Sequence, residues 1–499
     1  MTSPARLGRL IRGAAFWSVS GTALGQIVSF GSLLVMIRYV SPADYAAVAI
    51  GIVLVEILKA TFIESIGRAL TATPRPTNRD YSLWLWRAVI ISAALAAATG
   101  LLATPVAALT GNSRLEPVLQ VTALLLLLSG LTTVPVARLS QSFRFRAIAV
   151  SLVAASLVGG AVGIAMAASG FGLWSLLAQQ LAVSSALCVL LWVVGGWLPS
   201  AEARSGGSPS PGTVVHVGTT GALEEIDSRI DFMIVAAAFS PHAAGLYGLA
   251  KRVMGAACYL AVTPIERILL PFFARTELSR GAAVPKRLLA SLRIGNSLLG
   301  LGVLQIVVVL PLLVQVVLRS DWGGAASLVA ALGAAPYFRS TFSYSTAVIL
   351  TSGRADLQKR LMLLSAALNI LVVACASQLE LVWVAAGFTA ASAVAAAIAM
   401  IAAEWVLKLP ALSCLRAVAP SLTALCAASG AAWLLLALGG ADISFPVGAG
   451  VGLAANALYL LLLWRLDRPT MTLIAAHVLP RGAGGGKRSG DSLDTSAGR

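Results

Sequence analysis

Charged residues are scarce in this chain. Only 11% of its 499 residues are Asp, Glu, Lys or Arg, whereas 58% are hydrophobic and the mean hydropathy is +0.88. A soluble protein carries about 25% charged residues, so this chain cannot cover a folded core with a hydrated surface. Soluble enzymes and disordered proteins are therefore excluded, and the long, non-alternating apolar runs exclude a transmembrane β-barrel.

Cysteine and histidine are also rare. The five cysteines form no C-x-x-C pair and lie in apolar stretches, which is typical of small buried side chains, and the three histidines are scattered. The glycine-rich segment Gly482–Gly486 lacks the spacing of a phosphate-binding loop. Acids in the predicted outer loops are isolated, and those loops are short. We therefore predict no catalytic residue, no metal and no cofactor.

Apolar runs long enough to cross a membrane recur along the chain, since a membrane helix needs about 20 such residues. We expect an all-α integral membrane protein with about 14 transmembrane helices. The predicted spans are 13–37, 44–66, 84–108, 116–137, 147–169, 173–197, 215–238, 244–273, 294–318, 325–351, 357–377, 381–405, 414–438 and 445–464.

Positive charge outnumbers negative charge, with a formal net charge of +16. In a membrane protein this excess indicates cytoplasmic loops rather than nucleic-acid binding. Outside the predicted spans, every Lys and Arg falls on one side of the membrane except Arg38, Arg114 and Arg319. We therefore place both termini in the cytoplasm and expect no nucleic-acid partner.

Three weak sequence similarities occur in the same order in two parts of the chain. The first pairs Ser41-Pro42 with Ser240-Pro241, each before an apolar helix that contains a tyrosine. We predict two pseudo-symmetric six-helix lobes that start on the same side of the membrane, with a cavity between them. The expected units are a lobe at 1–198, a cytoplasmic linker at 199–212, a lobe at 213–408, two further helices at 409–464 and a cytoplasmic, disordered tail at 465–499.

Charges inside the spans are the candidates for function, because a lone charge at the bilayer centre costs several kcal/mol and usually faces a cavity or a partner. Helical spacing predicts that Glu56 pairs with Lys59 and Glu64 with Arg68. It also predicts a pair between Glu225 and Arg229. Structural pairing of this kind explains part of the pattern, and a functional cavity explains the rest.

The remaining in-span charges gather on a few helices near the expected junction of the lobes. Asp227 and Asp231 share a face of span 215–238 with Glu224. Lys251 and Arg252 are about 100° apart on the next span, so we expect only one to face the cavity. We favour Arg252, paired with Glu266 when the cavity is empty.

Several short segments carry a resemblance to a known protein family. They include Val134–Arg138 with Phe143–Ala147, Gly170–Trp174, Arg229–Val235 with Gly245–Ala250, and Leu270–Phe273. In this order, over about residues 10–405, they resemble the Wzx-like oligosaccharide flippases, which are relatives of the multidrug and toxin extruders.

The resemblance implies a flippase that moves undecaprenyl-pyrophosphate-linked repeat units across the bacterial inner membrane by alternating access. It implies a lipid-linked oligosaccharide as substrate, with a polysaccharide polymerase and co-polymerase as partners, and we expect a monomer. The predicted cavity cations are Arg229, Lys251, Arg252 and Arg339. The predicted coupling or cavity acids are Asp227, Asp231 and Glu56. The alternative is a cation-coupled drug or metabolite antiporter of the same fold.

Overall fold

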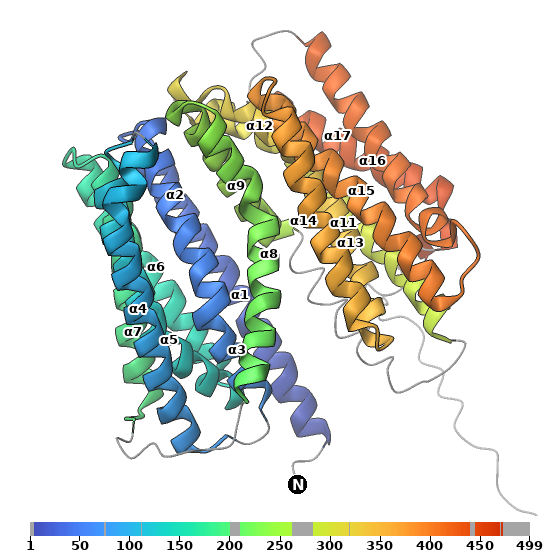
Figure 1. The fold of residues 1–499 in the computed structure, drawn as a ribbon. Helices are drawn as coiled ribbons and strands as arrows, with labels where there is room; N and C mark the ends of the chain where they lie inside the picture. Colours follow the sequence, from blue (N-terminus) through green and yellow to red (C-terminus); the bar gives the residue numbers. More distant parts are fainter. Residues whose placement is uncertain are drawn as a thin grey trace, which may run out of the picture.

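The protein is a bundle of long helices, seen here in a computed structural model (Figure 1). The structure describes residues 4–73, 76–110, 112–199, 210–261, 283–318, 320–439, 445–469 and 471–472. All regular elements within these ranges are helical, as the apolar runs predict, because only helices satisfy their own backbone hydrogen bonds within lipid without closing into a barrel.

The first half of the chain forms one bundle, drawn in blue and teal in Figure 1. Its elements are α1 (Pro4–Met36), α2 (Pro42–Leu58), the π-helical turn η1 (Lys59–Ile63), α3 (Glu64–Ala72), α4 (Asn78–Thr110), α5 (Leu115–Gln141), α6 (Phe145–Ala168) and α7 (Leu173–Gly195). Ser41 begins α2 by accepting a hydrogen bond from the backbone N–H of Asp44, which satisfies one of the unpaired donors at the helix start.

The second half forms another bundle, in green, yellow and orange (Figure 1). It contains α8 (Pro211–Ala238), α9 (Pro241–Ala261), α11 (Ala283–Val317), η3 (Ser320–Trp322), α12 (Ala325–Leu332), α13 (Ala335–Thr351), α14 (Ala355–Ala376) and α15 (Leu381–Leu407). The helices α16 (Ser413–Leu438) and α17 (Phe445–Leu466) pack on α11 at its outer edge. Predicted span 325–351 is divided at Gly333 and Ala334 into α12 and α13.

Ten of the described helical segments are long and apolar enough to cross a membrane. The other four predicted spans coincide with α1, α8, α9 and the α12–α13 pair, whose described residues do not reach the same combination of length, apolarity and low charge. The protein is therefore a multi-pass membrane protein. The count of 14 crossings stays a prediction, as does the division into lobes at the stated boundaries.

The two bundles meet along α2, α8 and α9 (Figure 1). Near the start of α2, Gly245 of α9 packs so closely that a Cβ placed on it would lie 2.0 Å from the carbonyl oxygen of Pro42. Toward the start of α8, a Cβ on Gly218 would lie 2.4 Å from the carbonyl oxygen of Thr61 in η1. These two contacts join the bundles above and below the middle of the junction.

Candidate functional site

A cavity of about 520 Å³ lies at the junction between the two close contacts. Its walls come from α1, α2 and α7 of the first bundle and from α8, α9, α13 and α15 of the second. The four predicted cavity cations, Arg229, Lys251, Arg252 and Arg339, all line it. They come from three helices of the second bundle, so the fold brings together charges that are far apart in sequence.

Lys251 is held in place by the interior of the second bundle. Its ammonium binds the Asp231 carboxylate, with 2.8 Å between Nζ and Oδ2, and donates to the carbonyl oxygen of Ser228 at 3.0 Å. The hydroxyl of Tyr247 donates to the same Asp231 oxygen at 2.6 Å. Asp231 is completely buried, and Lys251 and Tyr247 both bind its Oδ2 atom, whereas its Oδ1 atom has no hydrogen-bond partner among the described residues.

Arg339 projects from α13 toward a second acid. Its guanidinium lies 3.1 Å from the carboxylate of Asp227 on α8, which also accepts a hydrogen bond of 2.7 Å from Asn369 on α14. The ring of Phe388 on α15 lies beneath both Arg339 and Lys251, with distances of 5.8 and 4.1 Å from its centroid to the two cationic groups. Both cations therefore gain a cation–π contact and a fixed position.

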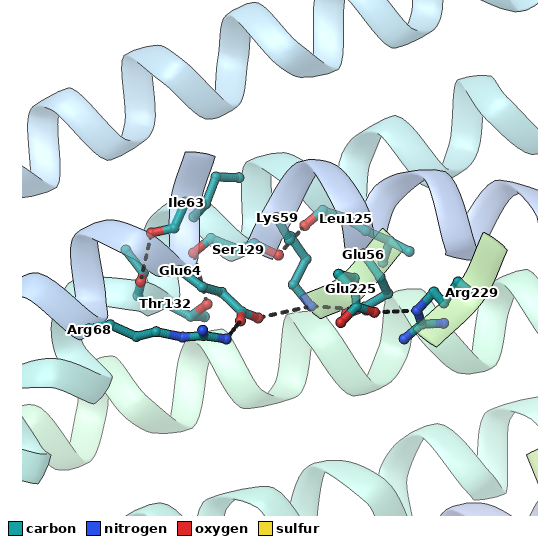
Figure 2. Close-up of polar contacts among 11 residues, drawn as sticks. Glu56, Lys59, Ile63, Glu64, Arg68, Leu125, Ser129, Thr132, Glu225 and Arg229 are labelled. Carbon is teal, nitrogen blue, oxygen red and sulfur yellow. Dashed lines mark hydrogen bonds and ion pairs between the residues drawn. The ribbon is translucent and has the colours of Figure 1, made fainter. Parts of the chain in front are cut away.

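Arg229 forms the predicted ion pair with Glu225, one turn earlier on α8. Arg68 of α3 lies between two acids, at 3.3 Å from Glu64 on its own helix and 3.8 Å from Glu224 on α8. Figure 2 shows a row of charges that leads from Arg68 and Glu64 at one end to Glu225 and Arg229 at the other. The row follows the contact between α3 and α8 toward the central cavity.

Lys59 occupies the middle of this row, on the π-helical turn. It binds Glu56 at 3.0 Å, as the sequence predicts, and also Glu64 at 3.7 Å. In an α-helix residues five apart lie about 140° apart, whereas a π-turn brings them to the same face. The hydroxyl of Thr133 on α5 donates to the carbonyl oxygen of Ile63, which supports the turn.

Arg252 differs from the other three cations. It is exposed and, among the residues that the structure describes, it makes no ion pair. Its predicted partner Glu266 lies outside the described residues. The expectation that only one of Lys251 and Arg252 faces the cavity is wrong, because both line it. Long side chains on adjacent positions can reach one cavity when the cavity extends around the helix.

The acids lie behind the cations rather than in the cavity. The described lining contains no Asp or Glu, and the predicted acids Asp227, Asp231 and Glu56 each bind a cation, namely Arg339, Lys251 and Lys59. Glu225 binds Arg229 in the same way, so three of the four cavity cations are paired with acids outside the cavity lining, while Arg252 has no ion-pair partner among the described residues. A cavity lined by cations and by no acid among its described residues favours an anion over a cation.

Sequence reasoning missed the side chains that position these charges. Tyr247, Phe388 and Asn369 come from three different helices, and only their packing against α8 and α13 gives them a role. It also missed uncharged polar side chains that line the cavity, among them Gln26, Ser29, Gln179 and Gln180. Polar residues inside apolar spans are the signal that would have identified them. The described residues include no cluster of His, Cys, Asp or Glu that could hold a metal ion.

The fold is shared with known transporters. The structure resembles the lipid II flippase MurJ in an inward closed conformation, with a TM-score of 0.62 and 11% identity over 90% of this chain and 98% of that one. It also resembles a MATE protein in complex with MaL6, with a TM-score of 0.55 and 13% identity over 80% and 96% of the two chains. A mutant of the Vibrio cholerae MATE transporter VcmN gives the same TM-score at 14% identity, over 81% and 99%.

A multi-pass helical membrane protein with the MurJ and MATE fold is therefore the class that the structure defines. The model of one family, described as polysaccharide biosynthesis protein, matches residues 35–327. The chain belongs to this family, as the sequence resemblance predicts. It is 26% identical over 163 residues to the succinoglycan biosynthesis transport protein ExoT of Rhizobium meliloti (strain 1021), a match that spans 33% of each chain.

Proposed function

We propose that this protein is a flippase that moves a lipid-linked oligosaccharide with an anionic phosphate headgroup across the bacterial inner membrane. The observation that carries the proposal is the cavity at the junction of the bundles, lined by four cations and by no acid among its described residues. A pyrophosphate that enters a membrane must exchange its hydration shell for charged donors, because an unpaired anion in a low dielectric is very costly. Arg252 has no ion-pair partner among the described residues, so it offers such a donor without breaking an ion pair with any of them.

The family and the fold support this proposal. The family is one of polysaccharide biosynthesis proteins, and ExoT is named as a succinoglycan transport protein. MurJ, whose fold this chain shares, is named as a lipid II flippase. In this proposal the substrate is an undecaprenyl-pyrophosphate-linked repeat unit, the two termini are cytoplasmic, and a polymerase and co-polymerase consume the product. The residues act by binding, without covalent catalysis.

Reconstitution in liposomes tests the function directly. The purified protein is incorporated with a fluorescent undecaprenyl-pyrophosphate saccharide, and a membrane-impermeant quencher reports the fraction of label in each leaflet. Protein-dependent exchange between leaflets, absent with undecaprenyl phosphocholine as the control lipid, is the expected result. If the protein exchanges neither lipid but exports cationic drugs, the flippase proposal is wrong and the antiporter reading replaces it.

A further inference from the structure

The central cavity has two chemically different walls. The second bundle contributes the four cations described above and three serines, whereas every polar side chain from the first bundle is uncharged. The uncharged polar residues of the first bundle are Gln26 and Ser29 on α1, Tyr45 on α2, and Gln179 and Gln180 on α7. Their position within apolar helices requires an explanation, because a polar side chain in a membrane span is costly unless it has a partner.

Only part of this neutral wall is used to hold the first bundle together. The amide of Gln179 donates to the hydroxyl of Ser32 at 2.6 Å, and Ser32 donates to the carbonyl oxygen of Ser29 at 2.9 Å. The first of these bonds connects α7 to α1, and the second lies within α1. By contrast, the side-chain amides of Gln26 and Gln180 have no hydrogen-bond partner among the described residues, although both line the cavity. Two unpaired amides therefore face the space between the bundles.

An amide offers two donors and an acceptor and carries no charge. It suits a ligand rich in hydroxyl groups, each of which also donates and accepts. A phosphate, by contrast, is bound most strongly by the charged donors of the opposite wall. We propose that Gln26 and Gln180 form a saccharide subsite that binds the first sugar of the lipid-linked substrate while the cation wall holds its pyrophosphate. This inference rests on the proposed function and assigns an orientation to the substrate within it.

The size of the cavity suits the sugar nearest the phosphate. A volume of about 520 Å³ is that of a pocket for a drug-sized molecule. A pyrophosphate with its first sugar is a ligand of that class, so we assign the first sugar to the subsite.

Binding to two probes separates the subsite from the phosphate site. The full-length protein in nanodiscs is titrated with undecaprenyl pyrophosphate and with undecaprenyl pyrophosphate that carries a single hexose. We expect the wild type to bind the hexose-bearing lipid more tightly. Gln26→Ala and Gln180→Ala each weaken that binding by roughly three- to tenfold, the range of one or two lost hydrogen bonds, and leave the sugar-free lipid unaffected. Arg252→Ala weakens the binding of both lipids.

The matched control is Gln120→Ala, on the exposed surface of α5, which should change neither affinity. Gln26→Asn and Gln180→Asn keep the amide and should retain part of the difference between the lipids. Two results would overturn the subsite alone. One is equal affinity of the wild type for the two lipids, and the other is an equal loss of affinity for both lipids in the glutamine variants. A wild type that binds neither lipid would overturn the proposed function as well.

Discussion

Lys251 on α9 is joined to Asp231 on α8 by an ion pair of 2.8 Å in which the carboxylate is completely buried. The two helices border the cavity from the same bundle, and Tyr247 donates to the same carboxylate oxygen. The position of the Lys251 charge is therefore determined by an acid that the substrate cannot reach. The pair gives the cavity wall a fixed geometry and cancels most of the charge of Lys251.

Removal of the acid should destabilise the protein. Asp231→Asn leaves Lys251 partly buried without its counter-charge, and breaking a buried pair in this way costs about 3–5 kcal/mol. We expect a clear drop in Tm of the purified protein in detergent. Asp231→Asn combined with Lys251→Gln should be less destabilised than Asp231→Asn alone, since no uncompensated charge remains. If the double variant is the less stable, the pair does not act as described.

Loss of Arg252 should abolish transport without unfolding the protein. The side chain is exposed and makes no ion pair within the described residues. Arg252→Ala therefore removes a hydrogen-bond donor to the substrate phosphate and little packing. Cells that carry it should insert the protein normally and accumulate lipid-linked repeats on the inner side. Arg252→Lys should restore part of the export, because the charge is kept while the forked geometry is lost.

The control for this experiment is Arg360→Ala, an exposed cation on α14 outside the cavity, which should export normally. Normal export by a stably inserted double variant, Arg229→Ala with Arg252→Ala, would contradict the assignment of the phosphate site. Arg339 would then be the next residue to test.

The close contacts at Gly245 and Gly218 should close opposite ends of the cavity. Gly245→Ala would place a methyl group against the Pro42 backbone and separate α9 from α2, whereas Gly218→Ala would separate α8 from η1. A cysteine at Ser29, in a cysteine-free background, reports access to the cavity. We expect faster labelling from the outer side in Gly245→Ala and from the inner side in Gly218→Ala.

Gly31→Ala is the control for these variants, since a Cβ on Gly31 meets no atom within 4 Å. It should not change labelling from either side. Labelling from the same side in both glycine variants would show that the two contacts do not close opposite ends of the cavity.

Transport should depend on an ion gradient or on the membrane potential, or run downhill as the polymer is consumed, and it should not depend on ATP. The candidate coupling acids are Asp227, Asp231 and Glu56, each of which binds a cation whose charge protonation of the acid would release. In proteoliposomes, Asp227→Asn should lower the dependence of transport on the imposed gradient. Transport that requires ATP, with ATP hydrolysis by the purified protein, would contradict this prediction.

The predicted topology can be tested with membrane-impermeant thiol reagents. Cysteines at Asn112 or Ala441 should react from the outer side of intact cells, and cysteines at Gly207 or Gly485 should react only after the membrane is opened. Labelling of either glycine position from outside would contradict cytoplasmic termini.

The sequence predicts the helices and the cluster of charges for a clear physical reason. Apolar length identifies membrane helices, and the cost of a charge in lipid marks the residues that need a cavity or a partner. Local spacing also predicts the pair of Glu225 with Arg229 and of Glu56 with Lys59. The confirmed pairs are those within one turn of a single helix.

Partners from other helices were not predictable in this way. Asp227 meets Arg339 only because α8 and α13 face each other, and Phe388 lies beneath two cations only because α15 packs behind them. The prediction from helical angles that only one of Lys251 and Arg252 faces the cavity was also wrong. Whether a side chain reaches a cavity depends on the shape of the cavity as well as on the angle of the residue around the helix. Side-chain reach and tertiary packing decide these contacts.

The π-helical turn at Lys59–Ile63 sets the rotational phase of everything that follows it in α3. One extra residue within a turn rotates the subsequent side chains by about 100° relative to an uninterrupted α-helix. In this phase Arg68 points at Glu224 of the opposite bundle, and Gly67 lies against Thr133 of its own bundle. Without the extra residue, the side chains of α3 would point in other directions and these contacts would not form. The contact between the two bundles at this end therefore depends on one additional residue in the turn that precedes α3.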